Sequence, residues 1–178
     1  MPLGPVRDLG PAIVEWGSDT IAEIFGDVRW TLVGERRKVF EALYGATPVD
    51  QVFLGYSECK IVVPATRMLL ALLNTILPGG VINSTGDTVN VAAAGAGAKT
   101  GFSMYESGLP LFIKPIVDGV AADNGKWLRL ERTYPIPNYD VVFNLEDQRV
   151  YGIEFDACPD ATSKRLWECG RVNVGTSY

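Results

Sequence analysis

Residues 47–80 read TPVDQVFLGYSECKIVVPATRMLLALLNTILPGG, and they place a strand pattern directly before a helix pattern. β-branched and aromatic residues dominate Val52–Val63, which predicts a β-strand. Gly55 interrupts this run, and a glycine inside a strand is typical of a bulge or of a close approach by another backbone. The first half of the segment therefore predicts a strand with a local irregularity at Gly55.

The second half predicts the only convincing helix of the sequence, at about residues 65–77. Pro64 can begin a helix, because the first helical turn does not need the N–H that proline lacks. Across Thr66–Leu77 the apolar residues recur at spacings of three and four and form one broad face, made of Leu69, Leu70, Leu72, Leu73, Ile76 and Leu77. An isolated helix of about 12 residues is marginal in water, so we expect this face to pack on a sheet or on a neighbouring subunit.

The rest of the chain indicates short strands separated by turns. Its 19 glycines and 11 prolines lie between short apolar runs, as in β-rich proteins. Lys126–Thr133 alternates between charged and apolar residues after an Asn-Gly turn signal, and Val150–Cys158 alternates again. In the latter run Ile153, Phe155 and Ala157 share one face, and Glu154 and Asp156 share the other. The predicted fold is mainly β, a β-sandwich or partial barrel with one flanking α-helix and long loops.

Residues 34–47 (GERRKVFEALYGAT) are ambiguous, since they could form a helical face or an exposed hairpin or loop. Their basic triplet, Arg36, Arg37 and Lys38, is typical of a solvated loop. A contact with acidic residues of a neighbouring copy is the alternative.

Composition argues against several function classes. The chain has 178 residues, 47% hydrophobic and 21% charged, as in an ordinary globular protein, and a net charge of −5 that disfavours nucleic-acid binding. It has no histidine, so Ser-His-Asp and Cys-His catalysis are excluded. Three cysteines at unrelated spacings favour reduced, partly buried thiols over a metal site. Near Gly95–Thr100, Ala98 and Ala93 occupy the two positions where a phosphate-binding loop needs glycine. No secretory signal or membrane span is evident. We expect no enzyme activity, no cofactor and no membrane association.

Glu154 and Asp156 are the carboxylate pair closest to an acid–base arrangement, because they are two residues apart on one strand face. Such chemistry requires burial that separates their pKa values. Their face is opposite the apolar one, so the pattern favours solvent exposure instead.

The order of elements resembles the tail tube (major tail) protein of long-tailed bacteriophages. The likeness covers residues 23–172 and includes FGDV and WTLV, a long polar-tipped loop, TPVDQVFLGYSECKIVVPAT, a helix ending LLNTILPGG, and the closing strand VYGIEFDAC. We therefore expect residues 1–22 to form an N-terminal arm and first strand, and residues 23–178 a single tail-tube-like β domain.

The resemblance implies a structural virion protein. Six copies would form a ring, and stacked rings would form a hollow tube around the tape-measure protein, with tail terminator and baseplate proteins as further partners. DNA would pass through the lumen without specific binding, in the virion tail, after assembly in the bacterial host cytoplasm. Loop 34–50 would reach the adjoining ring, with Arg36, Arg37 and Lys38 as inter-ring contacts, and Glu154 and Asp156 would line the bore. The alternatives are another ring-forming tail component (tail terminator, neck or baseplate hub), a secretion-system tube protein of similar fold, and, in a different class, a small binding module or an unrecognised enzyme.

Overall fold

The structure is a computed structural model of the chain, and it describes residues 11–21, 23–24, 26–67, 69–91, 101, 103–117, 120–136 and 150–170. Gly95–Thr100, the tract without the phosphate-loop glycines, lies outside these described residues.

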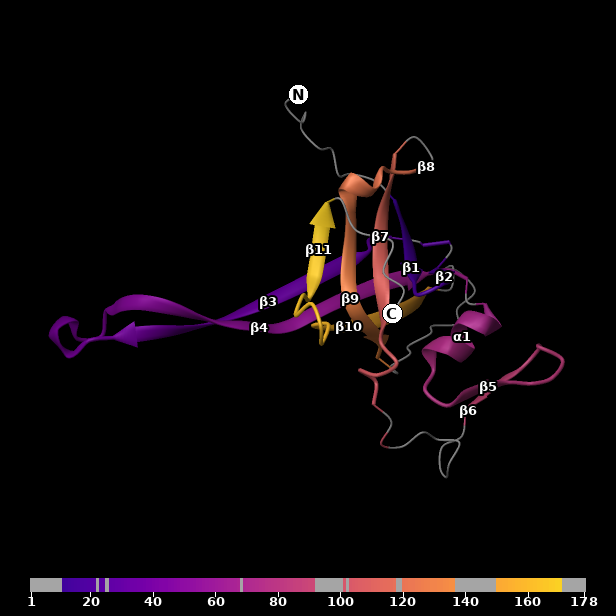
Figure 1. Cartoon of the computed structure of the whole chain (residues 1–178), viewed down its shortest axis with the longest axis horizontal. Helices are drawn as coiled ribbons and strands as arrows, with labels where there is room; N and C mark the ends of the chain where they lie inside the picture. Colours follow the sequence, from indigo (N-terminus) through magenta and orange to yellow (C-terminus); the bar gives the residue numbers. More distant parts are fainter. Residues whose placement is uncertain are drawn as a thin grey trace.

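One nine-stranded antiparallel sheet dominates the fold (Figure 1). Its strands are β1 (Ala12–Trp16), β2 (Asp19–Ile21), β3 (Arg29–Phe40), β4 (Pro48–Ala65), β7 (Leu109–Val117), β8 (Val120–Ala121), β9 (Trp127–Pro135), β10 (Tyr151–Cys158) and β11 (Trp167–Gly170). The main order is β2-β1-β7-β9-β10-β4-β3, with β8 on β7 and β11 on β9. A second sheet joins β5 (Gly80–Ile82) to β6 (Val89–Val91), and α1 (Leu70–Ile76) is the single α-helix of the described residues. The prediction of a mainly-β chain with one α-helix is confirmed.

Strand β9 is the branch point of the large sheet. On one side it pairs with β7; on the other, residues 127–130 pair with β11 and residues 132–135 pair with β10. The rings of Trp30 on β3 and Trp167 on β11 meet edge to face with their centroids 5.1 Å apart. This contact shows that the sheet curls, because it brings β3 against β11, a strand that lies outside the main path.

The core lies on the concave side of this curl and follows the predicted alternation. On β10, Ile153 and Phe155 are buried, while Glu154 and Asp156 lie on the opposite face. Trp16 packs against Phe155 with ring centroids 5.6 Å apart. Each fully buried large apolar side chain contributes about 1.5–3 kcal/mol before the entropy cost, so the sheet is stabilised chiefly from this one face.

The helix is shorter than predicted, and Pro64 does not begin it. Strand β4 continues through Pro64 to Ala65, and α1 begins only at Leu70. Proline is tolerated here because β3 begins opposite Val62, so β4 has no β3 neighbour at Pro64. Of the six aliphatic residues predicted to form the packed face, only Leu72 and Ile76 are buried; the helix is anchored to the core by two side chains.

Residues 34–47 form neither a helix nor a loop, so of the readings left open by the sequence the hairpin is correct. Residues up to Phe40 extend β3, Ala42–Tyr44 make a 3₁₀ turn, and the chain returns as β4. Figure 1 shows these two strands projecting far from the body of the molecule. We call residues 33–58 the projecting hairpin.

Candidate assembly surfaces

The projecting hairpin is solvent-exposed on both faces. Every residue from Val33 to Glu58 is exposed except Gly55. β4 changes character at Cys59, because from there to Ala65 buried and partly buried residues alternate. One continuous strand is therefore anchored in the core at one end and carries a free two-stranded ribbon at the other.

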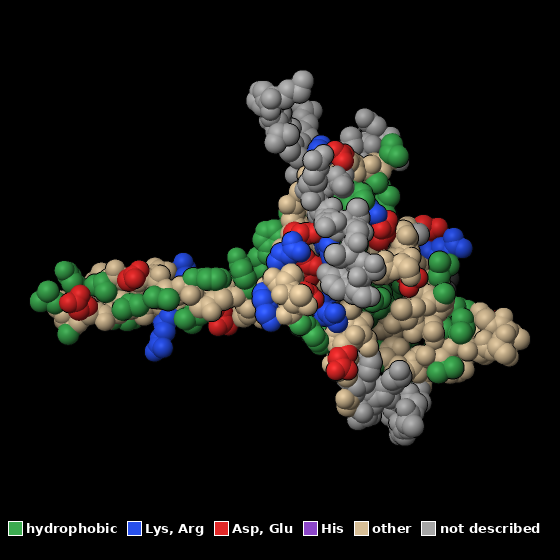
Figure 2. Space-filling model, viewed as in Figure 1, with side chains coloured by type: hydrophobic (Ala, Val, Ile, Leu, Met, Phe, Trp, Pro, Cys, Tyr) green, Lys and Arg blue, Asp and Glu red, His purple; other side chains and the backbone are tan. Residues whose placement is uncertain are grey.

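Large hydrophobic side chains cover this ribbon. Ten of them are exposed on it: Val33, Val39, Phe40, Leu43, Tyr44, Val49, Val52, Phe53, Leu54 and Tyr56. Leu43, at the tip, is 80% exposed. Figure 2 shows hydrophobic side chains along its whole length, with acidic and basic groups interspersed among them. An isolated two-stranded hairpin is marginally stable at best in water, and large exposed apolar patches typically mark interaction surfaces.

The hairpin is strongly irregular in register. Three β4 residues, Ser57, Leu54 and Val49, have no opposing residue on β3, so the ladder shifts at each of them. Gly55 has φ 138, a conformation that side-chain-bearing residues rarely adopt, and it lies beside the Leu54 bulge. The predicted irregularity at Gly55 is thus confirmed. Because bulges increase local twist, the ribbon cannot form a flat edge that would pair indiscriminately.

The basic triplet lies on the outer half of the hairpin. Arg36, Arg37 and Lys38 are exposed and pair in register with Phe53, Val52 and Gln51. Consecutive strand residues point to opposite faces, so Arg37 faces away from the other two. None of the three forms an ion pair with a carboxylate in the part of the chain that the structure describes. Their predicted inter-ring role stays a prediction.

A second apolar surface lies at the other end of the molecule. Residues 69–91, which we call the flap, contain α1, β5 and β6 and extend opposite the projecting hairpin in Figure 1. Five of its large hydrophobic residues are exposed: Leu69, Leu70, Val81, Ile82 and Val91. The flap is therefore incompletely covered by its own chain.

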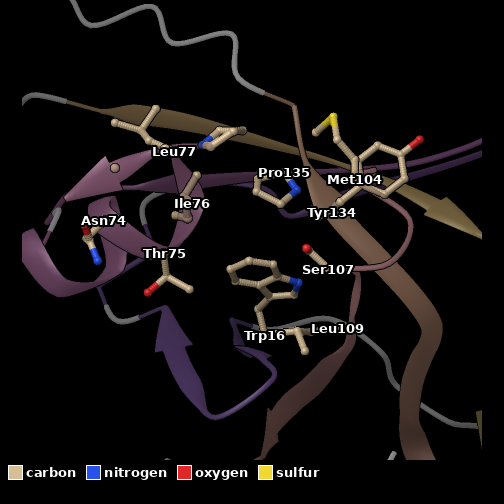
Figure 3. Close-up of a pocket in the computed structure, with 13 residues that line it drawn as sticks. Trp16, Asn74, Thr75, Ile76, Leu77, Met104, Ser107, Leu109, Tyr134 and Pro135 are labelled. Carbon is tan, nitrogen blue, oxygen red and sulfur yellow. The ribbon is translucent and has the colours of Figure 1, made fainter. Parts of the chain in front are cut away.

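A cleft separates the flap from the sheet, and we call it the flap cleft. It has a volume of about 260 Å³ and is lined by Trp16, Asn74, Thr75, Ile76, Leu77, Pro78, Gly79, Gly80, Met104, Ser107, Leu109, Tyr134 and Pro135. Figure 3 shows the indole of Trp16 in its floor, with Thr75 of the helix and Ser107 on opposite sides. The Trp16 indole N–H donates to the Thr133 carbonyl at 3.3 Å, which fixes the ring. The cleft is thus a preformed, largely apolar recess.

Glu154 and Asp156 are partly buried on the outer face of β10. Glu154 Oε2 lies 3.4 Å from Lys60 Nζ, and Glu58 lies 3.8 Å from the same ammonium. Burial raises the pKa of Asp156, the Lys60 charge opposes this, and Glu58 and Glu154 add to it. The hydrogen bond and charge of Glu154 raise the pKa of Lys60. The arrangement is an acidic patch neutralised in part by one lysine, and no acid–base site is evident in it.

A buried ion network, which the sequence pattern did not reveal, lies on β9. Arg129 and Glu131 are each 2% exposed, and Arg129 Nη2 lies 3.0 Å from Glu131 Oε2. Arg165 and Glu168 complete it, since Glu131 contacts Arg165 at 3.4 Å and Glu168 contacts Arg129 at 3.4 Å and Arg165 at 2.9 Å. Each carboxylate thus contacts both guanidinium groups. The network pins the segment that leads into β11 onto β9.

The described residues contain no group of three or more His, Cys, Asp or Glu side chains suited to hold a metal ion. Cys59, Cys158 and Cys169 are free thiols, of which the first is buried and the last exposed. Burial raises the pKa of the Cys59 thiol, and burial together with a bond to Cys158 raises the pKa of Tyr134 to about 12. Within the described ranges no helix has the length and apolar character that crossing a membrane requires.

Comparisons with known proteins give likenesses among solved structures alone. No family model matches the chain, and no curated protein matches it. A chain described as the PVC sheath/tube terminator of an extracellular contractile injection system in the extended state is 12% identical, with a TM-score of 0.43, over 89% of this chain and 96% of that one. A chain of the PVC sheath-tube complex in the extended state is also 12% identical with a TM-score of 0.43, over 92% of this chain and 94% of that one.

Proposed function

We propose that this chain is a structural subunit that assembles with copies of itself into stacked hexameric rings and forms a tail tube, a conduit for the genome. The observation that carries the proposal is the apolar, exposed projecting hairpin. The order of elements in the chain also resembles that of tail tube proteins. The proposal takes from this resemblance the hexameric ring, the tape-measure, terminator and baseplate proteins as partners, and the virion tail as the location.

The exposed area on the hairpin has the size of an interface. If each of its ten exposed hydrophobic side chains leaves on the order of 80 Å² in water, about half of what a large aromatic buries, the total is roughly 800 Å². The largest apolar patch on a typical monomer is about 300–600 Å². One partner of a standard protein–protein interface buries about 800 Å². The hairpin therefore matches a specific partner surface better than a solvated loop.

The function is structural in this proposal. DNA would pass through the lumen without specific binding, and the partly neutralised acidic patch of Glu154 and Asp156 would face it, since a cationic wall would bind phosphates. A particle carrying Glu154→Lys with Asp156→Lys should eject DNA more slowly than one carrying Asp123→Lys, an exposed control. Equal ejection rates for the two particles would show that Glu154 and Asp156 do not line the bore.

Removal of the hairpin tests the assembly role. Gly34 and Tyr56 are paired in register, so residues 35–55 can be replaced by an Asn-Gly turn without unpairing the rest of β3 and β4. Electron microscopy and sedimentation should show rings and tubes for the wild type, and rings without tubes for this variant. Tubes from the shortened variant would refute the role of the hairpin. Wild-type protein that remains monomeric at millimolar concentration would refute the proposal as a whole, and wild-type rings that never stack would favour a terminator, neck or baseplate ring.

A further inference from the structure

Exposed apolar side chains are concentrated at the two ends of the molecule. Of the 17 large hydrophobic residues that are exposed in the described part of the chain, ten lie on the projecting hairpin. Six lie on the flap or line its cleft: Leu69, Leu70, Val81, Ile82, Val91 and Leu109. Figure 1 shows the hairpin and the flap at opposite ends of the longest axis. A contact between them would join two different surfaces, which makes it head-to-tail and able to repeat from copy to copy.

We propose that the tip of the projecting hairpin of one copy inserts into the flap cleft of a second copy. The occupant is the tip formed by Phe40, Leu43 and Tyr44, and the recess is the one between α1 and the sheet. This inference rests on the proposed function, and it places the contact between copies in adjoining rings.

The size and chemistry of the cleft suit side chains. Its volume of about 260 Å³ lies below the roughly 300–1,000 Å³ of small-molecule sites, so it has room for one or two side chains. Trp16, Ile76 and Pro135 give it apolar walls. Leu43 is 80% exposed, and Tyr44 and Phe40 are 57% and 56% exposed, so the tip offers apolar groups that contact little in their own chain.

The hairpin is long enough for this contact. The strand part of its first arm, residues 33–40, extends it by about 26 Å at roughly 3.3 Å per residue, and the 3₁₀ turn Ala42–Tyr44 forms the tip beyond it. A compact body of about 150 residues has a radius of gyration of about 15 Å. The strand part alone is longer than this radius, so the tip reaches past the nearest surface of a neighbouring subunit, which a contact limited to that surface would not require.

Charge is complementary at the two ends for the basic triplet, which the hairpin carries together with the carboxylates Glu35, Glu41 and Asp50. The triplet Arg36–Lys38 lies just behind the tip, whereas the exposed carboxylates Asp87 and Glu106 lie at the flap end, on the β5–β6 turn and beside Ser107 of the cleft. Hydrogen bonds from Asn83, Thr85 and Thr88 lower the pKa of Asp87, which keeps it ionised. A seated tip would thus bring Arg36 and Lys38, which share one face of the hairpin, toward an acidic rim.

Cross-linking between two tagged variants tests the contact directly. One carries Leu43→Cys and the other Ser107→Cys, both with Cys169→Ser to remove the exposed native thiol. With a short thiol-specific reagent we expect at least tenfold more heterodimer than from Leu43→Cys mixed with Val120→Cys, since Val120 is 67% exposed but lies on β8, away from the flap. Equal yields from the two mixtures would overturn the assignment.

Filling the cleft gives an independent test. Thr75→Trp places an indole at the cleft wall, and Thr162→Trp adds the same side chain at an exposed turn. We expect Thr75→Trp to keep rings and an unchanged thermal midpoint but to lose tubes at least tenfold, with Thr162→Trp assembling normally. Normal tubes from Thr75→Trp would show that the tip of the hairpin does not insert into the flap cleft, and they would leave the proposed function intact. Absence of rings in the wild type would instead refute the proposed function.

Discussion

The buried ion network on β9 makes a sharp stability prediction for Glu131→Gln. This change keeps the shape of a side chain that is fully buried but removes its charge. Arg129 then loses its 3.0 Å contact with the Glu131 carboxylate and keeps the 3.4 Å contact with Glu168, while its own side chain is 2% exposed. Breaking a buried pair by removing one partner costs about 3–5 kcal/mol, and the remaining contact places this case near 3 kcal/mol. For a chain of this length that corresponds to a fall of about 6–12 °C in the thermal midpoint.

Arg165→Gln is the matched control, because Arg165 contacts the same Glu131 but its side chain is 54% exposed. A pair with an exposed partner is worth about 0–1 kcal/mol. Urea unfolding of the full chain, below the concentration at which it assembles, should therefore separate the two variants by about 2 kcal/mol or more. The double variant Arg129→Met with Glu131→Leu should cost less than Glu131→Gln, since it leaves no buried charge. A loss below 1 kcal/mol for Glu131→Gln, equal to that of Arg165→Gln, would refute the reasoning.

Three further predictions concern the other charged groups. Asp156→Asn should stabilise the fold at pH 7, with an advantage that fades as the pH falls toward 3.8, the ordinary pKa of the group. The pKa of Asp156 is raised in the folded state, so its protonated form is the stabilising one, and that contribution is lost as the pH rises through the folded pKa. A pH series of thermal midpoints checks this, and a lower midpoint for the variant at pH 7 would contradict it. Asp160→Asn should lower the thermal midpoint at pH 7, because the Asp160 carboxylate accepts hydrogen bonds from the backbone N–H groups of Ser163 and Thr162, which lower its pKa. The difference in midpoint from wild type should shrink as the pH falls through that folded pKa. A difference that does not depend on pH would show that the charge of the carboxylate is not responsible. Reversal of Arg36, Arg37 and Lys38 to Glu should abolish tubes in microscopy while rings persist, and 0.5 M salt should weaken wild-type tubes, whereas salt-insensitive tubes would show that the triplet is solvated.

Local periodicity predicted those elements whose environment is set by the sheet itself. The alternation in Val150–Cys158 correctly assigned Ile153 and Phe155 to the core, because a half-buried strand imposes a period of two. The helix was predicted, but its start was misplaced, because a proline at a strand end and a proline at a helix start satisfy the same local rule. β4 continues past the start of β3 to Ala65 because its last residues pair with β10, a partner more than 80 residues later in the chain.

The features that define the candidate surfaces depend on distant contacts. Residues 34–47 remained ambiguous because both faces of the hairpin are exposed, and a strand without a buried face carries no alternation. Arg129 and Glu131 lie on the charged face of an alternating strand, and their ion-pair partners Arg165 and Glu168 lie more than 30 residues on. The clue available in the sequence was the number of apolar residues within 39–56, which is high for a solvated loop.

The anchoring of β4 connects assembly to the fold. The same strand contributes Ile61 and Val63 to the core and then continues into the projecting hairpin, so the hairpin needs no hinge to be held away from the body. Its three bulges twist the ribbon along its length, and twist protects an unpartnered apolar ribbon from stacking flat against other copies. A projection whose base is fixed in the core loses less conformational entropy when it binds than a free segment would. It also accepts only a partner of matching shape at a fixed distance from its base. In the proposed assembly a subunit adds to the growing structure in one orientation, which needs both properties, and both follow from one strand that is buried at one end and bulged at the other.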